Sequence, residues 1–386
     1  MSSKPRFVGE KVKLGDVATY VNGYAFKPSD YSDSGLPIVR IQNLTGNAYR
    51  TNRYEGTLPE KFAIQDGDIL ISWSASLGVF EWNQGSAWLN QHIFRVVFNK
   101  AMIDKRFFVH QARFLIQKSQ NLAHGATMKH LTKKVFEMLP FLYLGLNNQK
   151  MIAEQLDALD TQINRAKRQI RFLDNLVKSR FVEMFGRAED EHSVFPVKTL
   201  DDVCASIVRG PFGSALKKEF FVPKGPGVYK VYEQKHAIRK QVDIGTYYIS
   251  SDRFETLKRF ECHPGDILMS CSGTMGRLYQ LPPNCEPGVM NQALCKFTLS
   301  DSILVDYFLG FMEQVVDELG AKGSGIKNVS SVKFIKAIRI PLPPVELQGR
   351  FAAFVSQVDK SRFIAQQQIE KLQVLYDSLA QDYFGD

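Results

Sequence analysis

One short segment of this chain has the residue types and spacing that metal-dependent DNA cleavage uses. Glu233, Gln234 and Lys235 follow one another, and a carboxylate two positions before a lysine is half of a Mg²⁺ nuclease site. Such a site needs a further acidic residue upstream, and no Pro-Asp pair precedes Glu233. A nuclease built around Glu233 and Lys235 therefore stays open only as an alternative.

Other catalytic signatures are missing from the sequence. An adenine methyltransferase would carry an Asn-Pro-Pro-Phe type loop, but Leu281-Pro282-Pro283-Asn284 has its polar residue on the wrong side. No Gly-x-x-x-x-Gly-Lys-Ser/Thr loop for ATP is present. We therefore expect no catalytic residue and no cofactor, with the chemistry carried by partner subunits.

The cysteines do not form a metal or disulfide pattern. The chain has 5 cysteines, an odd number without a Cys-x-x-Cys pair, and all of them lie in the second half. A structural zinc site needs tighter ligand spacing. The sequence predicts buried free thiols and no metal.

Polar residues suited to reading DNA follow the predicted strands and turns. Arg, Lys, Gln, Asn and Ser contact base edges and phosphates. Any one of them alone is more simply an ordinary surface residue, so the inference rests on the set and on a net charge of +9. The candidate DNA-binding residues of the first half are Arg40, Gln42, Asn43, Arg50, Arg53, Ser72, Ser74, Gln91 and Lys129. Those of the second half are Tyr232, Gln234, Lys235, His236, Arg239, Ser270, Ser272, Thr274, Arg277, Gln292 and Lys327.

These residues stand in a framework that occurs twice in the same order. The run Gly67-Asp68-Ile69-Leu70 returns as Gly265-Asp266-Ile267-Leu268, 198 positions later (265 − 67). Near the end of each copy, Gln149 matches Gln348 at an offset of 199 (348 − 149). A period this long indicates two copies of a whole domain with its helix. The framework repeats while the polar residues differ, as expected of a protein that reads two different half-sites.

The landmarks of each copy predict an α+β domain. Short runs rich in β-branched and aromatic residues lie between Gly, Pro and Asn breaks, which is typical of strands. Helical stretches follow at residues 105–119 and 305–319. The Gly-Asp step before a strand is first of all a turn, in which glycine supplies a positive φ.

Each copy ends in a long helical pattern with a narrow apolar seam. Apolar residues alternate at spacings of four and three, as in a coiled coil. The seam residues are Ile152, Leu156, Leu159, Ile163, Ile170 and Leu173 in the first copy and Val355, Val358, Ile369 and Leu372 in the second. Arg362 interrupts the second seam where the first has Ile163. We expect the two helices, each about 55 Å long, to form an antiparallel pair that holds one domain at each end; separate packing or an intermolecular coiled coil are the alternatives.

This organisation resembles the specificity (S) subunits of type I DNA restriction and modification systems. The resemblance rests on the two Gly-Asp-Ile-Leu runs, on the Gly-x-x-x-Lys segments at Gly125 and Gly323, and on Ile340-Pro341-Leu342-Pro343-Pro344 before the second helix. The first copy departs from that last pattern, since Leu139-Pro140 lacks the double proline.

The resemblance implies two target-recognition domains, residues 1–146 and 187–343, and two coiled-coil spacer helices, 147–186 and 344–386. It implies double-stranded DNA with a bipartite site and two methyltransferase (M) subunits as partners, with restriction (R) subunits possible. The spacer helices would fix the distance between the half-sites. A coiled-coil scaffold without sequence recognition remains an alternative. With no signal peptide and no run of apolar residues long enough to span a bilayer, we expect a cytoplasmic protein without a membrane partner.

Overall fold

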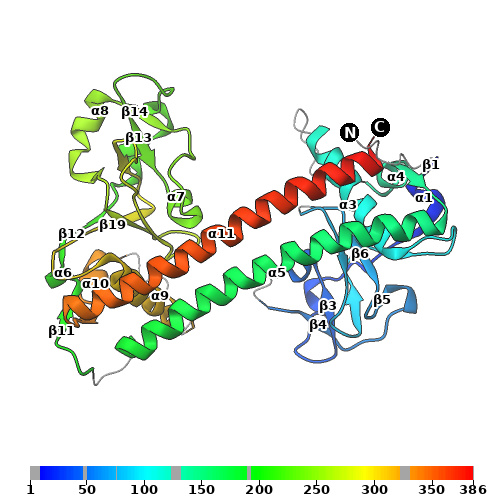
Figure 1. The fold of residues 1–386 in the computed structure, drawn as a ribbon, viewed down its shortest axis with the longest axis horizontal. Coiled ribbons are helices and arrows are strands. Elements are labelled where there is room, and N and C mark those ends of the chain that lie inside the picture. Colours follow the sequence, from blue (N-terminus) through cyan, green and yellow to red (C-terminus); the bar gives the residue numbers. More distant parts are fainter. Residues whose placement is uncertain are drawn as a thin grey trace. The chain divides into compact units, whose positions relative to one another are not determined.

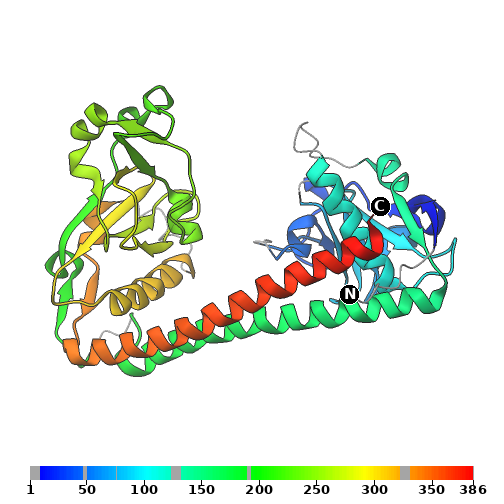
Figure 2. The same cartoon turned by 45° about the horizontal axis from the view of Figure 1, so that its top comes forward.

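The computed structural model describes residues 9–46, 50–74, 76–122, 132–188, 193–321 and 331–385. The chain divides into two compact units, which we call unit 1 (Met1–Arg168 with Ala365–Asp386) and unit 2 (Gln169–Ile364). Each unit contains one globular domain and a segment of each of the two long helices (Figures 1 and 2). The units are described separately.

Unit 1 contains two four-stranded sheets with the orders β2-β9-β6-β7 and β4-β3-β8-β5. Neighbouring strands are antiparallel except β3 and β8, which are parallel. The strands are β2 (Thr19–Asn22), β3 (Leu36–Val39), β4 (Arg53–Tyr54), β5 (Ala63–Ile64), β6 (Ile69–Ser72), β7 (Gly78–Glu81), β8 (Ala87–Leu89) and β9 (Ile93–Val97).

Besides the long helices, unit 1 has α1 (Leu14–Val17), α2 (Ile41–Leu44), α3 (Lys105–Leu122) and α4 (Lys133–Glu137). Residues of α1, α3 and α4 belong to the core cluster of the first sheet, whereas those of α2 pack against a separate cluster that contains strands of both sheets. A separate two-stranded ribbon joins β1 (Glu10–Lys13) to β10 (Pro140–Tyr143). The largest core cluster brings β2, β6 and β9 together with α3 and the long helices.

Unit 2 repeats this design with the same connections. Its sheets have the orders β12-β19-β16-β17 and β14-β13-β18-β15, and again one pair, β13 with β18, is parallel. The strands are β11 (Val197–Thr199), β12 (Cys204–Arg209), β13 (Val228–Tyr232), β14 (Tyr248–Ser250), β15 (Glu261–Cys262), β16 (Ile267–Ser270), β17 (Leu278–Gln280), β18 (Gly288–Met290), β19 (Leu294–Leu299) and β20 (Arg339–Pro341). The helices are α6 (Leu200–Val203), α7 (Gln234–Arg239), α8 (Ser251–Thr256), α9 (Val305–Ala321) and α10 (Val332–Lys336). The predicted α+β class and the internal repeat are confirmed.

The two Gly-Asp steps are turns, as predicted. Gly67 has φ +84° and Gly265 has φ +89°, a region that only glycine adopts freely. The following carboxylates close the turns, since Asp68 accepts a hydrogen bond from the Gln65 amide at 2.9 Å and Asp266 accepts one from the His263 amide at 2.8 Å. Each turn delivers the chain into a strand whose residues are all buried.

The long helices are α5 (Leu146–Phe185) and α11 (Val345–Phe384). Within each unit they pack side by side in opposite directions (Figure 1). In unit 1 the first half of the α5 seam packs with the last half of α11, and in unit 2 the remaining halves pack together. The predicted antiparallel pair is confirmed, and the seam residues are buried or half-buried.

Arg362, which interrupts the second seam, makes its own interhelical contact. Its guanidinium forms ion pairs with Asp174 on α5 at 2.8 Å and with Asp359 at 2.5 Å. A charged residue thus keeps the seam closed because its partner lies on the facing helix.

All five cysteines are free thiols, as predicted, and Cys285 alone among them is only half-buried. None of the helices in the described part of the chain is long and apolar enough to cross a membrane.

Candidate nucleic-acid interface

In each unit, three loops meet at one edge of the sheets. In unit 2 these are the loops after β12, β16 and β18. The amide of Gly210 donates to the carbonyl of Leu294 at 2.9 Å, and the amide of Cys271 donates to Ala293 at 2.8 Å. A Cβ at Gly210 would lie 1.8 Å from the carbonyl oxygen of Asn291. The close approach of these two backbones therefore requires glycine.

Unit 1 has the same junction between the loops after β2, β6 and β8. Gly23 donates to Ile93 at 3.2 Å, and a Cβ there would lie 2.3 Å from the carbonyl oxygen of Asn90. The amide of Trp73 donates to His92 at 3.4 Å. Gln91 and His92 are thus fixed beside the loop that carries Trp73 and Ser74.

A short helix after the first strand of the second sheet borders each junction. In α2 the side chain of Asn43 accepts a hydrogen bond from the Arg40 amide at 3.0 Å. In α7 the Nδ1 atom of His236 accepts the amide of Glu233 at 2.9 Å, and Nε2 lies 2.7 Å from the carbonyl of Ile244. Burial lowers the pKa of His236, so the neutral ring, with Nε2 donating, fits these contacts. Asn43 and His236 therefore cap the N-termini of α2 and α7 from equivalent positions, the third residue of each helix.

Some predicted DNA-binding residues lie inside the fold. Ser270 donates to the carbonyl of Thr274 at 2.6 Å, Ser72 donates to the carbonyl of Ser76, and Tyr232 donates to the carbonyl of Glu286 at 2.5 Å. These three side chains and His236 are fully buried. A side chain without exposed surface cannot touch a base, so they support the loops from beneath. Ser74 is also buried.

Other predicted residues are placed at the surface. Gln42, Arg239, Ser272, Thr274, Arg277 and Gln292 are exposed, and Arg40, Gln91, Gln234 and Lys235 are half-buried. The Gln234 side chain lies close to the backbone of Gly273, with its Nε2 atom 3.7 Å from where a Cβ would stand. The structure thus brings the start of α7 together with the loop after β16. Lys129 and Lys327 lie outside the described residues.

Two further predicted arginines of unit 1, one before β4 and one in it, have partners in neighbouring turns. The exposed Arg50 forms an ion pair with Asp33. Arg53 donates to the carbonyl of Gly35 at 2.7 Å. Arg277 lies apart from them, in unit 2, on the wall of a groove of about 800 Å³ that long-helix residues also line.

The Glu-x-Lys segment forms an ion pair within itself. Lys235 Nζ lies 2.6 Å from Glu233 Oε2 and 5.3 Å from the ring centre of Tyr247. In the described ranges, no group of three or more His, Cys, Asp and Glu side chains is placed to hold a metal ion. Glu233 and Lys235 are both half-buried, and the contact between them is a local ion pair.

Sequence reasoning missed several residues beside the junctions. Trp73 packs against His92 with ring centres 5.5 Å apart. In unit 2, Arg209 donates to the carbonyl of Cys271 at 3.4 Å, and Phe212 is 90% exposed in the same loop. A Gly-Pro-Phe-Gly run after a strand marks an exposed loop, and that was the available signal for Phe212.

Two lysines of unit 2 are buried and do not contribute to a basic surface. Lys230 forms an ion pair with Glu286 at 2.9 Å, and Lys296 forms one with Asp266 at 3.1 Å. Burial opposes the charge of Glu286, but Lys224 and Lys230 hold its pKa at about 2. Each pair ties a strand, β13 or β19, to the turn that precedes a neighbouring strand.

Comparisons with known proteins agree on one family. A family model described as "Type I restriction modification DNA specificity domain" matches residues 9–171 and again residues 194–374. The chain is 22% identical to the type I restriction enzyme EcoBI specificity subunit of Escherichia coli, over 90% of this chain and 78% of that protein. It is 20% identical to the MjaVIII specificity subunit of Methanocaldococcus jannaschii, over 94% and 89%. A chain solved in work on complex assembly and conformational transition of the type I R-M system shares the fold, with a TM-score of 0.50, 16% identity and complete coverage of both chains.

Proposed function

Because this chain belongs to the type I restriction-modification DNA-specificity family and carries its domain twice, we propose that each globular domain reads one half of a bipartite DNA site. The observation that supports this most is the pair of loop junctions. Their backbones are built alike, with a glycine packed against an asparagine carbonyl in both. Their exposed side chains differ, so each junction would read a different sequence.

In unit 2 we assign base contact to the start of α7 and to the loops after β16 and β18. Gln234, Ser272, Thr274 and Gln292 combine donors and acceptors that hydrogen-bond base edges. These side chains come from three separate segments, the start of α7 and the two loops, so each segment can contact a different base pair. Arg209 is suited to a phosphate beside them.

In unit 1 the corresponding surface has a different chemistry. Gln42, Gln91 and His92 supply the polar groups, with Trp73 beside them. Phosphate contacts from arginines such as Arg40 would make affinity depend on salt, without contributing sequence information.

The chain itself would perform no reaction in this scheme. Glu233 is neutralised by Lys235 within the same turn. We propose the division expected from the resemblance: recognition domains at residues 1–146 and 187–343, with spacer helices at 147–186 and 344–386. Methylation and cleavage then belong to partner subunits.

The long helices offer a surface on which methyltransferase subunits can dock. Large apolar side chains stand exposed on them: Phe172, Leu176, Phe363 and Ile364 in unit 2 and Val374 and Leu375 in unit 1. Buried apolar clusters carry most of the binding energy in protein interfaces. We propose two methyltransferase subunits as partners, with restriction subunits joining the same complex.

The test is a methylation map of the host genome with the gene intact, deleted and altered. Deletion should abolish methylation at a bipartite motif with an unspecified spacer. Replacing Ser272 and Thr274 by alanine should relax or change one half of the motif, and Gln42→Ala should affect the other half alone. Ser251→Ala, at an exposed position of α8 outside the loop junction, is the matched control and should leave the motif unchanged.

The alternatives predict different results. A nuclease at Glu233 would give Mg²⁺-dependent cutting by the purified chain that is lost in Glu233→Ala. A scaffold without recognition would leave the genome's methylated motif the same after both sets of loop substitutions. Either result would contradict the proposed function.

A further inference from the structure

Each globular domain packs one helix against the end of the long helix that belongs to the other repeat. We call residues 9–188 the first repeat and residues 193–385 the second. In unit 1, α3 of the first repeat contacts the last turns of α11, and Phe107 meets Phe384 with ring centres 5.6 Å apart. In unit 2, α9 of the second repeat contacts the last turns of α5, and Tyr307 meets Phe185 at 4.8 Å.

Hydrogen bonds fix the equivalence of positions between the two contacts. The side chain of Gln149 accepts from the Asp104 amide, and the side chain of Gln348 accepts from the Leu304 amide, both at 2.8 Å. Residues of α3 therefore match those of α9 at an offset of 200 (304 − 104), while α5 matches α11 at 199 (348 − 149). Differences at matched positions can thus be compared directly.

Four short sets of residues carry the differences. Notch 1 is the face of α3 with His110, Arg113 and Gln117, and notch 2 is the matching face of α9 with Gly310, Glu313 and Asp317. Tail 2, on α11, consists of Tyr376, Asp377 and Ala380; tail 1, on α5, consists of the matching Val177, Lys178 and Phe181. In the structure notch 1 holds tail 2, and notch 2 holds tail 1.

In one contact the tail carries the larger side chain, and in the other the notch does. In notch 2 the large group comes from the tail: the Phe181 ring packs so closely on Gly310 that a Cβ there would lie 2.5 Å from its Cδ2 atom. In notch 1 the large group comes from the notch. His110 is buried, and its Nδ1 lies 2.8 Å from the hydroxyl of Tyr376, while the tail contributes Ala380 where tail 1 has Phe181.

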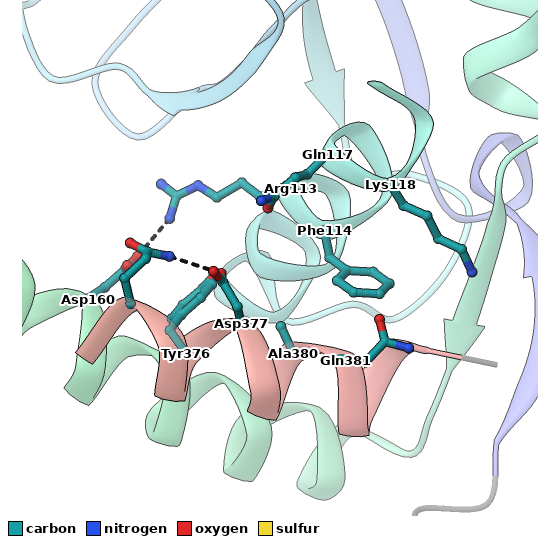
Figure 3. Close-up of a pocket in the computed structure, with 10 residues that line it drawn as sticks. Arg113, Phe114, Gln117, Lys118, Asp160, Tyr376, Asp377, Ala380 and Gln381 are labelled. Atoms are coloured by element: carbon teal, nitrogen blue, oxygen red, sulfur yellow. Dashed lines mark hydrogen bonds and ion pairs between the residues drawn. The ribbon is translucent and has the colours of Figure 1, made fainter. Parts of the chain in front are cut away.

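The charges are exchanged as well. In unit 2 the tail is basic and the notch acidic: Lys178 forms an ion pair with Asp317 at 2.8 Å, and this hydrogen bond raises the pKa of Lys178. In unit 1 the notch is basic and the tail acidic. Arg113 and Asp377 line one cavity of about 480 Å³, in which Arg113 pairs with Asp160 of α5 at 2.7 Å (Figure 3).

We propose that these exchanged sizes and charges make the pairing of the repeats selective, so that the first repeat closes on a second repeat and rejects another copy of itself. Every assembled subunit would then carry one domain of each kind and read an asymmetric site. The loop after β16 borders notch 2, since Gly276 and Arg277 line the same groove as Glu313 and Asp317, but the test of the pairing contains no DNA.

Each wrong pairing meets both a steric and an electrostatic penalty. With tail 1 in notch 1, Phe181 would meet His110 and Lys178 would meet Arg113. With tail 2 in notch 2, Asp377 would meet Asp317 in place of the cation Lys178, and Ala380 beside Gly310 would leave a void. Like charges brought together at an interface are a strong source of discrimination.

The experiment uses the full chain, nicked after folding. A protease site is inserted between Ala188 and Ser193, and nicked protein with an affinity tag on the first repeat is mixed with untagged nicked protein in urea. After the urea is removed, tagged first repeat is recovered and its partners are identified by mass. We expect the tagged first repeat to recover about a hundredfold more second repeat than untagged first repeat. Equal recovery of the two, as in random pairing, would overturn the proposal.

A grafted variant makes the test specific for the notches. Val177→Tyr, Lys178→Asp and Phe181→Ala together give the first repeat tail 2, so it should now retain untagged first repeat at least tenfold more than the unaltered protein. Lys167→Asp, a charge reversal at an exposed position of α5, is the matched control and should change nothing. A graft that leaves the pairing unchanged, or a control that changes it as much, would refute the assignment to these residues.

Discussion

Replacing Gly310 by alanine brings two opposing effects into competition at one position. In a helix interior, alanine is favoured over glycine by about 1 kcal/mol. Against this, the new Cβ would lie 2.5 Å from Cδ2 and 2.9 Å from Cε2 of Phe181. That ring cannot withdraw easily, since it is stacked on Tyr307 and packs on the edge of Phe351, each with ring centres 5.4 Å apart.

Overpacking of a well-filled core costs about 1–3 kcal/mol, and occasionally more. A contact this short between atoms held on both sides belongs in the upper part of that range. We therefore expect Gly310→Ala to lower the free energy of unfolding by about 1–2 kcal/mol after the helix-propensity gain is subtracted. Combining it with Phe181→Leu should cost less than the sum of the two single changes, because the smaller side chain makes room for the methyl group.

The matched control is Gly349→Ala, in the interior of α11, where a Cβ would meet nothing within 4 Å. There only the propensity term acts, and we expect a gain of about 0.5–1 kcal/mol. Urea unfolding followed by far-UV circular dichroism measures both as shifts of the midpoint. If the two alanines shift the midpoint in the same direction, the packing argument for Gly310 is refuted.

Three further predictions concern charged groups. Lys296→Met leaves Asp266 buried without its cation and should destabilise the protein by about 3 kcal/mol; a urea midpoint close to that of the unaltered protein would contradict this. The depressed pKa of Glu286 stabilises the fold fully above its ordinary value of 4.5, and the benefit is lost as pH falls through about 2. The stability difference between the unaltered protein and Glu286→Gln should therefore shrink between these two pH values, and a constant difference would exclude the ion pairs with Lys224 and Lys230 as the cause. Finally, Arg209→Ala should reduce the slope of log affinity against log salt by about one unit without changing the motif, which binding titrations at several salt concentrations test.

The repeat and the seam were predictable because they rest on spacing. The Gly67 and Gly265 turns need a positive φ that few other residues adopt, so the same residues mark the same turns twice. The seam follows from the period of the coiled coil, since Ile152 and Leu156 stand one turn apart on the buried face.

Which polar side chains face outward was not predictable from the strands. Exposure normally alternates along a strand, but every residue of β6 and β16 is buried. The final serines, Ser72 and Ser270, are therefore turned into the fold, where they hydrogen-bond the loops that follow. A prediction from alternation places such residues at the surface, because it assumes that one face of the strand is exposed. In these two strands both faces are covered.

Capping residues escaped prediction for a local reason. His236 has the chemistry of a base-reading residue, yet both of its ring nitrogens are hydrogen-bonded within the protein, to the Glu233 amide and the Ile244 carbonyl. Asn43 does the same in α2 through the Arg40 amide. In both cases a side chain three residues into the helix satisfies a backbone donor that would otherwise lack a partner, and its polarity serves the fold.

The two notches explain how a duplicated chain can keep its halves distinct. The frame residues Phe107 and Tyr307 occupy the same place against the terminal phenylalanines of the opposite long helix. At the matched positions beside them, a change in one repeat is compensated in the other: His110 goes with Tyr376, and Gly310 goes with Phe181. Because these compensating residues lie on α3, α5, α9 and α11, the base-reading side chains of the two domains can differ while the pairing of the repeats is kept.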